Sequence, residues 1–354
     1  MKISSKKSVR SGRPLRLALV GAGGIGKQWA DAIRKTKGVE LAAVVDVNLS
    51  GAKEIAASFL DCAATSNWYD VVHDKSIDAV LVATPHKWLA PISYGALAAK
   101  KHVLSEKPCG VNPREVEKNV KIARKNKVIY MPGFNHRYHP AYMKAREIFE
   151  RGGIGKASFI RARYGFGGRP GYNKEWRFKK NIAGGGELFD QGVHMIDMAR
   201  WFLGDIKDVH GFAQHMFWKG EVEDNGFALL RTRAGQVAQI HVSWSNWDWV
   251  HSFELYGDKG YLIIDGLDKR YHGPERLVWG VRDRTFAHPV EKRFEYPNET
   301  KYDSLRRELA AFIDATRVGG TVHGSGARRK KLGIPTGEDA YATMQIVEKI
   351  YKQS

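Results

Sequence analysis

The sequence predicts an α/β protein whose N-terminal domain is a doubly wound parallel sheet and whose C-terminal domain is α+β with a large open, mostly antiparallel sheet. Apolar runs of strand length alternate with helical stretches over residues 14–134, as in a parallel sheet between helices. Beyond residue 135, period-two stretches rich in aromatic and β-branched residues predominate, as in antiparallel strands. A chain of 354 residues is long enough for two buried cores.

The first domain opens with a strand, a glycine turn and a helix. Residues 15–20 form an apolar run, Gly21-Ala-Gly-Gly-Ile-Gly26 follows at once, and residues 27–37 continue with helical periodicity. In this arrangement Gly21 permits the tight turn, Gly23 lets backbone N–H groups approach a pyrophosphate, and Gly26 allows the helix to pack closely on the strand. The turn therefore predicts a Rossmann dinucleotide site at a helix N-terminus. Its expected contacts are Gly21, Gly23, Gly24, Ile25 and Gly26.

An acidic residue follows the second strand at the expected spacing. The apolar run 40–45 ends in Asp46, twenty positions after Gly26. A carboxylate there can accept both hydroxyls of the adenosine ribose and repels a 2′-phosphate. Val47 and Asn48 follow, where a phosphate-binding site would need Arg or Ser. The cofactor is therefore predicted to be NAD, with NADP the less favoured alternative.

The remaining elements continue each pattern. In the first domain, strands are expected at 79–83, 103–104 and 128–131, with helices at 49–60, 89–100 and 113–127. In the second, strands are expected at 157–164, 209–217, 227–232, 237–244, 253–256 and 261–264, and helices at 139–151, 302–318 and 338–352. Residues 1–13 are predicted to be a disordered basic tail, 14–134 the dinucleotide-binding domain, and 135–354 the substrate-binding and oligomerisation domain. The last helix is expected to pack back on the first domain.

Composition excludes several classes of protein. No apolar run approaches the roughly 18 residues of a membrane span, and the two cysteines, Cys62 and Cys109, offer neither a disulfide framework nor a CxxC metal site. A cytoplasmic protein without a bound metal is expected.

The net charge is +19, but ten basic residues lie in the N-terminal leader and in the run 328–331. Because no zinc-finger spacing or RNA-binding signature accompanies them, nucleic acid is not an expected partner. The rest of the charge suits an anionic substrate.

A glycine run leads into a polar helical segment in the second domain. Residues 184–197 read Gly-Gly-Gly-Glu-Leu-Phe-Asp-Gln-Gly-Val-His-Met-Ile-Asp, which places Asp190, His194 and Asp197 at offsets of four and seven. On a regular helix these side chains fall within about 60° of one another, opposite an apolar face. The pattern fits an acid/base site or a solvated helix face. Asp197 is interpreted as holding the helix or a neighbouring arginine.

Ser105-Glu106-Lys107-Pro108 directly follows the run 103–104. Ligands of doubly wound sheets bind beyond the carboxyl ends of the strands. Pro108 keeps Lys107 out of a helix, so the amine can hydrogen-bond a reacting oxygen or, if burial lowers its pKa, lose a proton. Taken alone, the lysine would equally suit a solvated loop.

Together, the glycine turn, Glu106-Lys-Pro and the Gly-Gly-Gly segment with Asp190 and His194 resemble the Gfo/Idh/MocA family of nicotinamide-dependent oxidoreductases. Thr84-Pro85, Gly133-Phe-Asn-His-Arg-Tyr138 and Trp176-Arg177 are smaller matches to it. The resemblance covers the chain from about residue 14 to its end. It implies that Lys107, Asp190 and His194 are the catalytic group. Thr84, Pro85, Glu106 and Lys107 are also assigned to the cofactor site.

The resemblance implies a sugar, inositol or sugar-nucleotide-like substrate whose secondary hydroxyl is oxidised or formed by hydride transfer. His194, with a pKa ordinarily near 6.5, suits the role of proton acceptor, Lys107 would stabilise charge on the oxygen, and Asp190 would orient substrate or imidazole. The residues assigned to substrate binding are Arg137, Arg163, Trp176, Asp190 and His194. Three tryptophans, Trp244, Trp247 and Trp249, either stack on a sugar ring or pack within the sheet.

Two other functions remain open for such a chain. One is an NAD-retaining glycosidase that uses transient oxidation, and the other is a non-catalytic dinucleotide-binding regulator. By analogy, a homodimer or homotetramer is expected, formed through the exposed face of the second domain's sheet.

Overall fold

A computed structural model of the chain describes residues 12–267, 269–283, 285, 288–317 and 333–354. These residues divide into two compact units, the first running to Gly133 and including Leu305–Tyr341, the second comprising Phe134–Ser304 and Ala342–Ser354. Residues 1–11 of the expected basic tail and the basic run 328–331 lie outside the described residues. Among those described, no helix combines the length and apolar character needed to cross a membrane.

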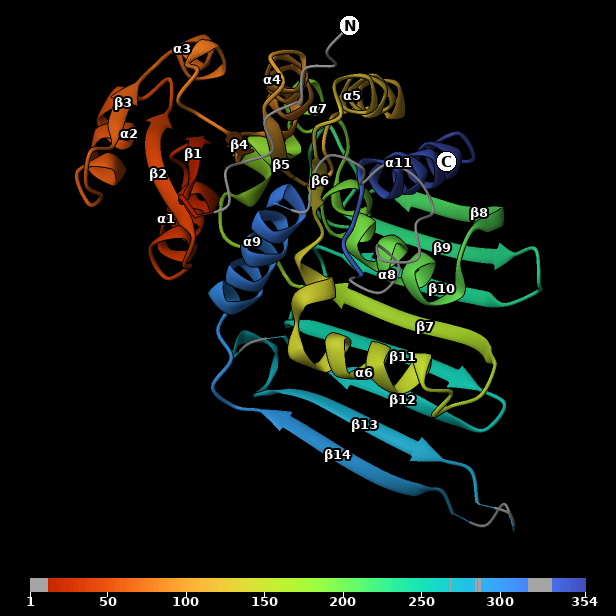
Figure 1. The fold of residues 1–354 in the computed structure, drawn as a ribbon. Helices are drawn as coiled ribbons and strands as arrows, with labels where there is room; N and C mark the ends of the chain where they lie inside the picture. The colour runs from red at the N-terminus through yellow and green to blue at the C-terminus, as the bar shows by residue number, and fades with distance from the viewer. Residues whose placement is uncertain (1–11, 268, 284, 286–287, 318–332) are drawn as a thin grey trace, which may run out of the picture. The chain divides into compact units, whose positions relative to one another are not determined.

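The first unit is a six-stranded parallel sheet with the strand order β3-β2-β1-β4-β5-β6 (Figure 1). Its strands are β1 (Leu15–Val20), β2 (Val39–Val45), β3 (Ala63–Thr65), β4 (Ala79–Val82), β5 (His102–Glu106) and β6 (Tyr130–Gly133). Its helices are α1 (Gly24–Arg34), α2 (Leu49–Ala56), α3 (Trp68–His73), α4 (His86–Ala98), α5 (Pro113–Asn126) and most of α9 (Lys301–Arg317). The predicted doubly wound sheet is confirmed.

Burial explains why these segments are strands. All four residues of β4 have no exposed surface, which is typical of a central parallel strand covered by helices on both faces. Two elements were not predicted, β3 and α3, because a strand of three residues and a helix of six are too short to show a period. Helix α1 begins at Gly24, earlier than predicted, because the glycine turn itself forms the first helical turn.

The second unit is an eight-stranded sheet with the order β14-β13-β12-β11-β7-β10-β9-β8. Its strands are β7 (Ala157–Gly165), β8 (Ile206–Gln214), β9 (Asn225–Thr232), β10 (Val237–Ser243), β11 (Val250–Gly257), β12 (Gly260–Asp265), β13 (Glu275–Val281) and β14 (Val290–Tyr296). Neighbouring strands run antiparallel except β7 and β10, which are parallel. The mostly antiparallel sheet is confirmed, whereas β13 and β14 were not predicted.

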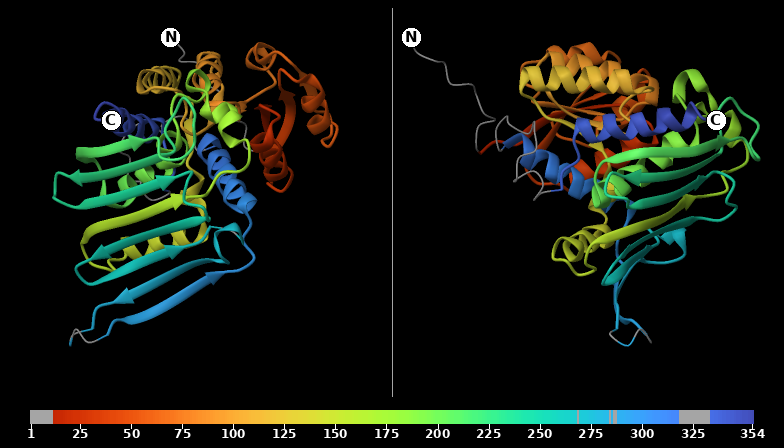
Figure 2. Two further views of the ribbon diagram at one scale, coloured as in Figure 1. Left: turned by 180° about the vertical axis from the view of Figure 1, so that it is seen from behind. Right: turned by 90° about the vertical axis from the view of Figure 1, so that its right-hand side faces the viewer.

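Helical segments precede, connect and follow these strands. They are η1 (Asn135–Tyr138), α6 (Pro140–Glu150), η2 (Tyr172–Lys174), η3 (Trp176–Phe178), α7 (Lys180–Ala183), η4 (Leu188–Gly192), α8 (Val193–Leu203), η5 (Lys269–Tyr271) and, from Ala342 onward, the C-terminal α11 (Gly337–Tyr351). Helices α6 and α8 lie on one face of the sheet, and no described helix covers the other face at β7, β10 and β11 (Figures 1 and 2). In β7, Ile160, Ala162 and Tyr164 are accordingly buried, while Phe159 is exposed.

An aromatic cluster fills the end of this sheet near the segment that precedes α8. Trp244 has no exposed surface and packs with Phe166, Tyr172, Phe178 and Val222. Trp244 therefore packs within the unit and does not offer its ring to a sugar, which decides between the two interpretations given for it. By contrast, the Trp247 side chain is 64% exposed.

Candidate functional site

The glycine turn of the first unit combines two close backbone approaches with open space. Gly21 has φ +110°, and a Cβ there would lie 2.3 Å from the Ala83 carbonyl oxygen. A Cβ on Gly26 would lie 1.9 Å from the carbonyl oxygen of Gly21. In contrast, no atom lies within 4 Å of the Cβ positions of Gly23 and Gly24. The turn thus needs glycine at its two ends and leaves room for a phosphate group at the N-terminus of α1.

Asp46 is bound to this turn. Its Oδ2 accepts a hydrogen bond from the Ala22 N–H at 2.7 Å, and its Oδ1 accepts one from the Asn48 N–H at 2.8 Å. Each carboxylate oxygen can accept a further hydrogen bond, so the carboxylate is fixed in place and still able to bind ribose hydroxyls. Val47, 93% exposed, offers no positive charge for a 2′-phosphate. The carboxylate of Asp46 and the lack of a positive charge at Val47 therefore fit NAD.

A buried hydroxyl lies beside the same turn. Thr84 Oγ1 is shielded from solvent and has no hydrogen-bond partner within the described part of the chain. The Thr84 backbone nitrogen lies 3.1 Å from the Cβ position of Gly21. A buried polar group normally finds a partner, and a dinucleotide at the glycine turn fits that need. Pro85 precedes α4 as its N-cap.

Glu106 and Lys107 lie where β5 ends. Glu106 Oε1 accepts a hydrogen bond from Trp29 Nε1 at 2.7 Å, so this carboxylate ties β5 to α1, and its contact with the cofactor stays a prediction. Lys107 is half-buried in a turn and outside any helix, as Pro108 predicts. Cys109, two residues on, is completely buried, and this burial raises the pKa of its thiol to about 12.

In the second unit, the segment with the three polar residues is not a regular amphipathic helix. Leu188–Gly192 forms a π-helical turn, and Val193–Leu203 continues as an α-helix. Asp190 and His194 are each 4% exposed and Asp197 has no exposed surface. Of the two alternatives that the spacing left open, the solvated helix face is therefore wrong, because α8 is buried on its polar side as well. Single π-helical turns are frequent at functional sites.

The glycine triplet before this turn is held by a carboxylate that sequence reasoning missed. Glu223 accepts hydrogen bonds from the Gly186 N–H at 2.9 Å, the Leu188 N–H at 3.1 Å and the Tyr351 hydroxyl at 2.8 Å. A Cβ on Gly186 would lie 1.8 Å from the Glu223 carbonyl oxygen, and one on Gly185 would lie 2.1 Å from the Tyr351 hydroxyl. The glycines are required because Glu223 and Tyr351 approach the backbone so closely. Glu223 and Tyr351 lie far from the glycine triplet in the sequence, so no local pattern could predict these contacts.

Two arginines bind the acidic residues of this segment. Arg177 Nε donates to Asp190 Oδ2 at 3.1 Å. Arg137 donates to both oxygens of Asp197, at 2.8 and 2.5 Å, and both side chains are buried. The interpretation that Asp197 holds a neighbouring arginine is confirmed. Since Arg137 is engaged in this pair, its assignment to substrate binding stays a prediction. Arg177 is a site residue that sequence reasoning noted only in the Trp176-Arg177 match to the family, without a role.

The imidazole of His194 lies against a second imidazole. The ring centroids of His194 and His136 are 4.1 Å apart, and Phe134 meets His194 edge-on at 6.2 Å. His136 belongs to the segment 133–138 that carries part of the family resemblance, but sequence reasoning assigned it no role. Within the described residues, no group of three or more His, Cys, Asp or Glu is placed to hold a metal ion.

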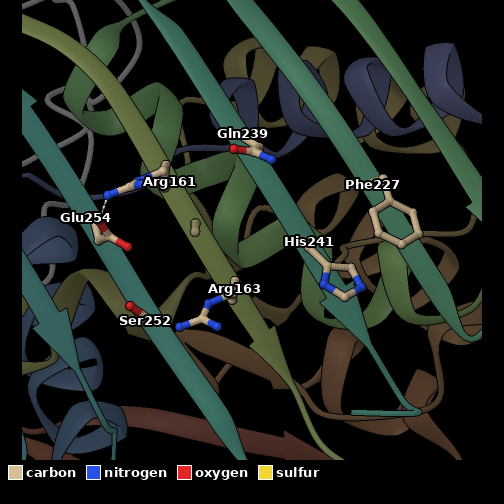
Figure 3. Close-up of a pocket in the computed structure, with 8 residues that line it drawn as sticks. Arg161, Arg163, Phe227, Gln239, His241, Ser252 and Glu254 are labelled. Carbon is tan, nitrogen blue, oxygen red and sulfur yellow. Dashed lines mark hydrogen bonds and ion pairs between the residues drawn. The ribbon is translucent and has the colours of Figure 1, made fainter.

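Of the predicted substrate residues, Trp176 lies beside the acid/base segment and Arg163 does not. The Arg177 guanidinium lies 4.6 Å above the Trp176 ring. The Arg163 side chain points to the face of the sheet that no described helix covers at β7, β10 and β11, here called the bare face. There it lines a pocket of about 390 Å³ with His241, Ser252 and Glu254 (Figure 3). Its neighbour Tyr164 faces His136 on the opposite side of the sheet. Arg163 and Tyr164 point to opposite faces because side chains alternate along a strand, so Arg163 lies on the other side of the sheet from His136, and its assignment to substrate binding stays a prediction.

Comparisons with known proteins agree with this arrangement. The chain matches the model of an oxidoreductase family with an NAD-binding Rossmann fold over residues 15–134 and a GFO/IDH/MocA C-terminal domain over residues 142–263. Levoglucosan dehydrogenase of Pseudarthrobacter phenanthrenivorans is 31% identical over 54% of this chain and 50% of its own length. A dTDP-3,4-didehydro-2,6-dideoxy-α-D-glucose 3-reductase of Saccharopolyspora spinosa is 26% identical over 96% of this chain and 97% of its own length. Myo-inositol 2-dehydrogenase of Thermotoga maritima is 26% identical over 86% of this chain and 89% of its own.

Solved structures show the same fold. Levoglucosan dehydrogenase in complex with NADH and levoglucosan has a TM-score of 0.85 at 24% identity and covers 97% of this chain and 98% of that one. A 3-ketoreductase from Actinomadura kijaniata in complex with NADP and TDP-benzene has a TM-score of 0.79 at 23% identity, covering 96% and 98%.

Replacing Asp197 with Asn should strongly destabilise the protein. The change leaves the Arg137 guanidinium buried without its carboxylate, which costs about 3–5 kcal/mol in comparable cases. Urea unfolding measures the effect. Asp205→Asn is the matched control, because this carboxylate pairs with Arg200 while 92% exposed, and its loss should cost at most about 1 kcal/mol. Equal losses in the two variants would contradict a structural role for the Arg137–Asp197 pair.

Glu223 should make stability depend on pH. Burial raises the pKa of its carboxyl to about 7, even though its hydrogen bonds act in the opposite direction. Because the folded-state pKa lies above the unfolded value, the contribution to the free energy of unfolding is present below about pH 4.5 and is lost as the pH rises through about 7.

The test compares unfolding of wild type and Glu223→Gln between pH 5 and 8. The stability advantage of wild type over the variant should shrink as the pH rises. Glu221→Gln is the control, since that side chain is 51% exposed, and it should give a difference that barely changes with pH. A pH-independent difference for Glu223→Gln would count against the buried carboxyl.

Proposed function

Because the chain belongs to the Gfo/Idh/MocA family of NAD-binding oxidoreductases, we propose that it oxidises, or reversibly reduces, a secondary hydroxyl of a sugar, inositol or sugar-nucleotide-like substrate. The observation that carries this proposal is the acid/base pair of the second unit. Asp190 and His194 are one helical turn apart, each 4% exposed, and are held by the contacts of Glu223 and Arg177. A carboxylate and an imidazole fixed in this way suit proton transfer.

Each proposed catalytic side chain has one task. Bound NAD supplies the hydride acceptor, held by the glycine turn, Asp46 and Thr84. His194 takes the proton of the substrate hydroxyl on a ring nitrogen, Asp190 orients the substrate or the imidazole, and Lys107 donates a hydrogen bond to the reacting oxygen. Lys107 belongs to the first unit and the other two to the second, and their joint role rests on the family resemblance.

The relatives support the substrate class. They are named as dehydrogenases and reductases of levoglucosan, of a dTDP-linked sugar and of myo-inositol, which favours this reaction over a glycosidase or a non-catalytic regulator. Trp176 and Arg137 remain proposed substrate contacts. The Arg177 side chain is 33% exposed next to Asp190, so it could also meet an anionic substituent of the substrate.

A second copy of the chain is the partner that we propose for the bare face of the large sheet. This face exposes Leu229 and Phe212, 51% and 60% accessible, and Phe159 stacks there on Tyr256 at 4.7 Å. Large apolar side chains exposed on one face of a sheet suit an interface. A homodimer or homotetramer would cover it with the same face of another subunit.

The proposed compartment is the cytoplasm. Both cysteines are free, which suits a reducing environment.

Incubating the protein with NAD and a panel of sugars, inositols and sugar nucleotides should produce NADH, read from its absorbance. His194→Gln should keep NAD binding, measured by calorimetric titration, because His194 belongs to the other unit from the glycine turn. Its turnover should fall at least about 100-fold, as is usual when a general base is lost.

His215→Gln removes an exposed imidazole from the same unit and should leave turnover unchanged. Near-normal turnover by His194→Gln would refute the proton-accepting role. Release of free sugar from a glycoside without net NADH would identify the glycosidase instead.

Charge on the bare sheet face should break the assembly. In Phe159→Asp/Leu229→Asp, two carboxylates replace apolar side chains that a second copy would bury, so light scattering after size exclusion should show a smaller particle than wild type. Leu60→Asp is the control, since Leu60 is 86% exposed in the first unit, and should keep the wild-type mass. A monomeric wild type would refute this interface.

A further inference from the structure

The bare face of the large sheet carries a pocket of about 390 Å³ that the proposed reaction does not use. Its lining comes from four neighbouring strands, in the order β11, β7, β10 and β9 (Figure 3). The volume lies in the range of small-molecule sites, about 300–1,000 Å³. A ligand in this pocket would be separate from the proposed acid/base pair, because Tyr164 contacts His136 on the opposite face.

The strand register places four side chains of the pocket in one row. Ser252 of β11 lies opposite Arg163 of β7, Arg163 lies beside His241 of β10, and His241 lies opposite Phe227 of β9. Side chains at such positions point to the same face of a sheet and lie close to one another. The Arg163 side chain therefore lies between a hydroxyl and an imidazole (Figure 3).

The two arginines of the pocket differ in their acidic partners. Arg161 Nη2 donates to Glu254 Oε2 at 2.6 Å, and the Tyr256 hydroxyl donates to the same oxygen at 3.1 Å. The Arg163 side chain forms no ion pair or hydrogen bond with the part of the chain that the structure describes. With two arginines and one glutamate, the lining keeps one positive charge, which Arg163 carries.

The neighbouring His241 adds no positive charge at neutral pH. Burial and the charge of Arg163 lower the pKa of His241 from its usual value of 6.5. Its Nε2 lies 3.1 Å from Asn225 Oδ1, and its ring stacks on Phe227 with the centroids 4.4 Å apart. His241 is thus a neutral wall of the pocket, and its pKa depends on how far the charge of Arg163 is balanced.

We propose that this pocket binds a small anion that carries a carboxylate or phosphate group. The planar guanidinium of Arg163 matches two oxygens of such a group, and the Ser252 hydroxyl and the Gln239 amide supply uncharged hydrogen bonds. The anion is distinct from the substrate of the acid/base pair, so the inference goes beyond the proposed reaction.

The proposed assembly gives this anion a further effect. A second copy on the bare face would take Arg163 out of water, and a buried charge without a partner is strongly unfavourable. An anion in the pocket balances that charge, so the assembled protein should bind it more tightly than a separate subunit. By linkage, the anion should then favour assembly. This consequence rests on the proposed interface, whereas binding of the anion does not.

Titration with inorganic phosphate or citrate at constant ionic strength tests the site, with excess NAD present to occupy the glycine turn. In wild type, NMR signals of His241 should show its pKa rising with anion concentration, because the bound anion cancels the charge of Arg163. In Arg163→Gln this rise should vanish. Calorimetry should show the anion bound about 10- to 100-fold more weakly, the scale of losing a charged hydrogen-bonding group.

Arg231→Gln is the matched control. It removes an arginine of the same face that already pairs with Asp208 at 2.8 Å, so it should bind the anion as wild type does. Undiminished binding in Arg163→Gln would place the anion elsewhere and overturn the inference.

An unchanged His241 titration in wild type with both anions would also overturn it. If Arg163→Gln then gave a smaller particle in light scattering, an acidic side chain of the second copy would be the occupant instead. Neither measurement involves turnover, so a failure to produce NADH would refute the proposed reaction and leave the anion site intact. A monomeric wild type that binds phosphate through Arg163 would refute the interface alone.

Discussion

The carboxylate of Glu223 fixes the segment on which the acid/base pair depends. It binds two backbone N–H groups at the start of the π-helical turn and the hydroxyl of Tyr351 on the C-terminal helix. The glycines of this segment follow from that contact, because any side chain at position 185 or 186 would collide with Tyr351 or Glu223. Asp190 and His194 are therefore placed by two residues that take no part in the proposed proton transfer.

The parts of the molecule that the sequence predicts well are those with local causes. The strand, turn and helix around Gly21 and the acid at Asp46 lie within a few dozen residues, and each has a backbone or charge requirement that only a few residue types meet. Buried parallel strands likewise show as continuous apolar runs. The short β3 and the largely exposed β14 lack such a pattern, so neither could be read from periodicity.

The site itself depends on contacts between distant residues. The spacing of Asp190, His194 and Asp197 suggested one helical stripe, but a π-helical turn changes the geometry and burial surrounds all three. Arg137 reaches Asp197 across sixty positions, and the rings behind His194 come from η1, α6, β7 and β11. No single segment shows these partners, because each side chain alone is an ordinary arginine, histidine or tyrosine. The family resemblance identified the reacting groups but not their surroundings.

Cys109 lies two residues from Lys107, and its burial has a consequence for the chemical durability of the protein. Oxidants and alkylating reagents attack the thiolate, and with a thiol pKa of about 12 almost none is present at neutral pH. Its side chain is also completely enclosed. Burial and the raised pKa together therefore shield this position, next to the loop that presents Lys107, from oxidation in the folded protein.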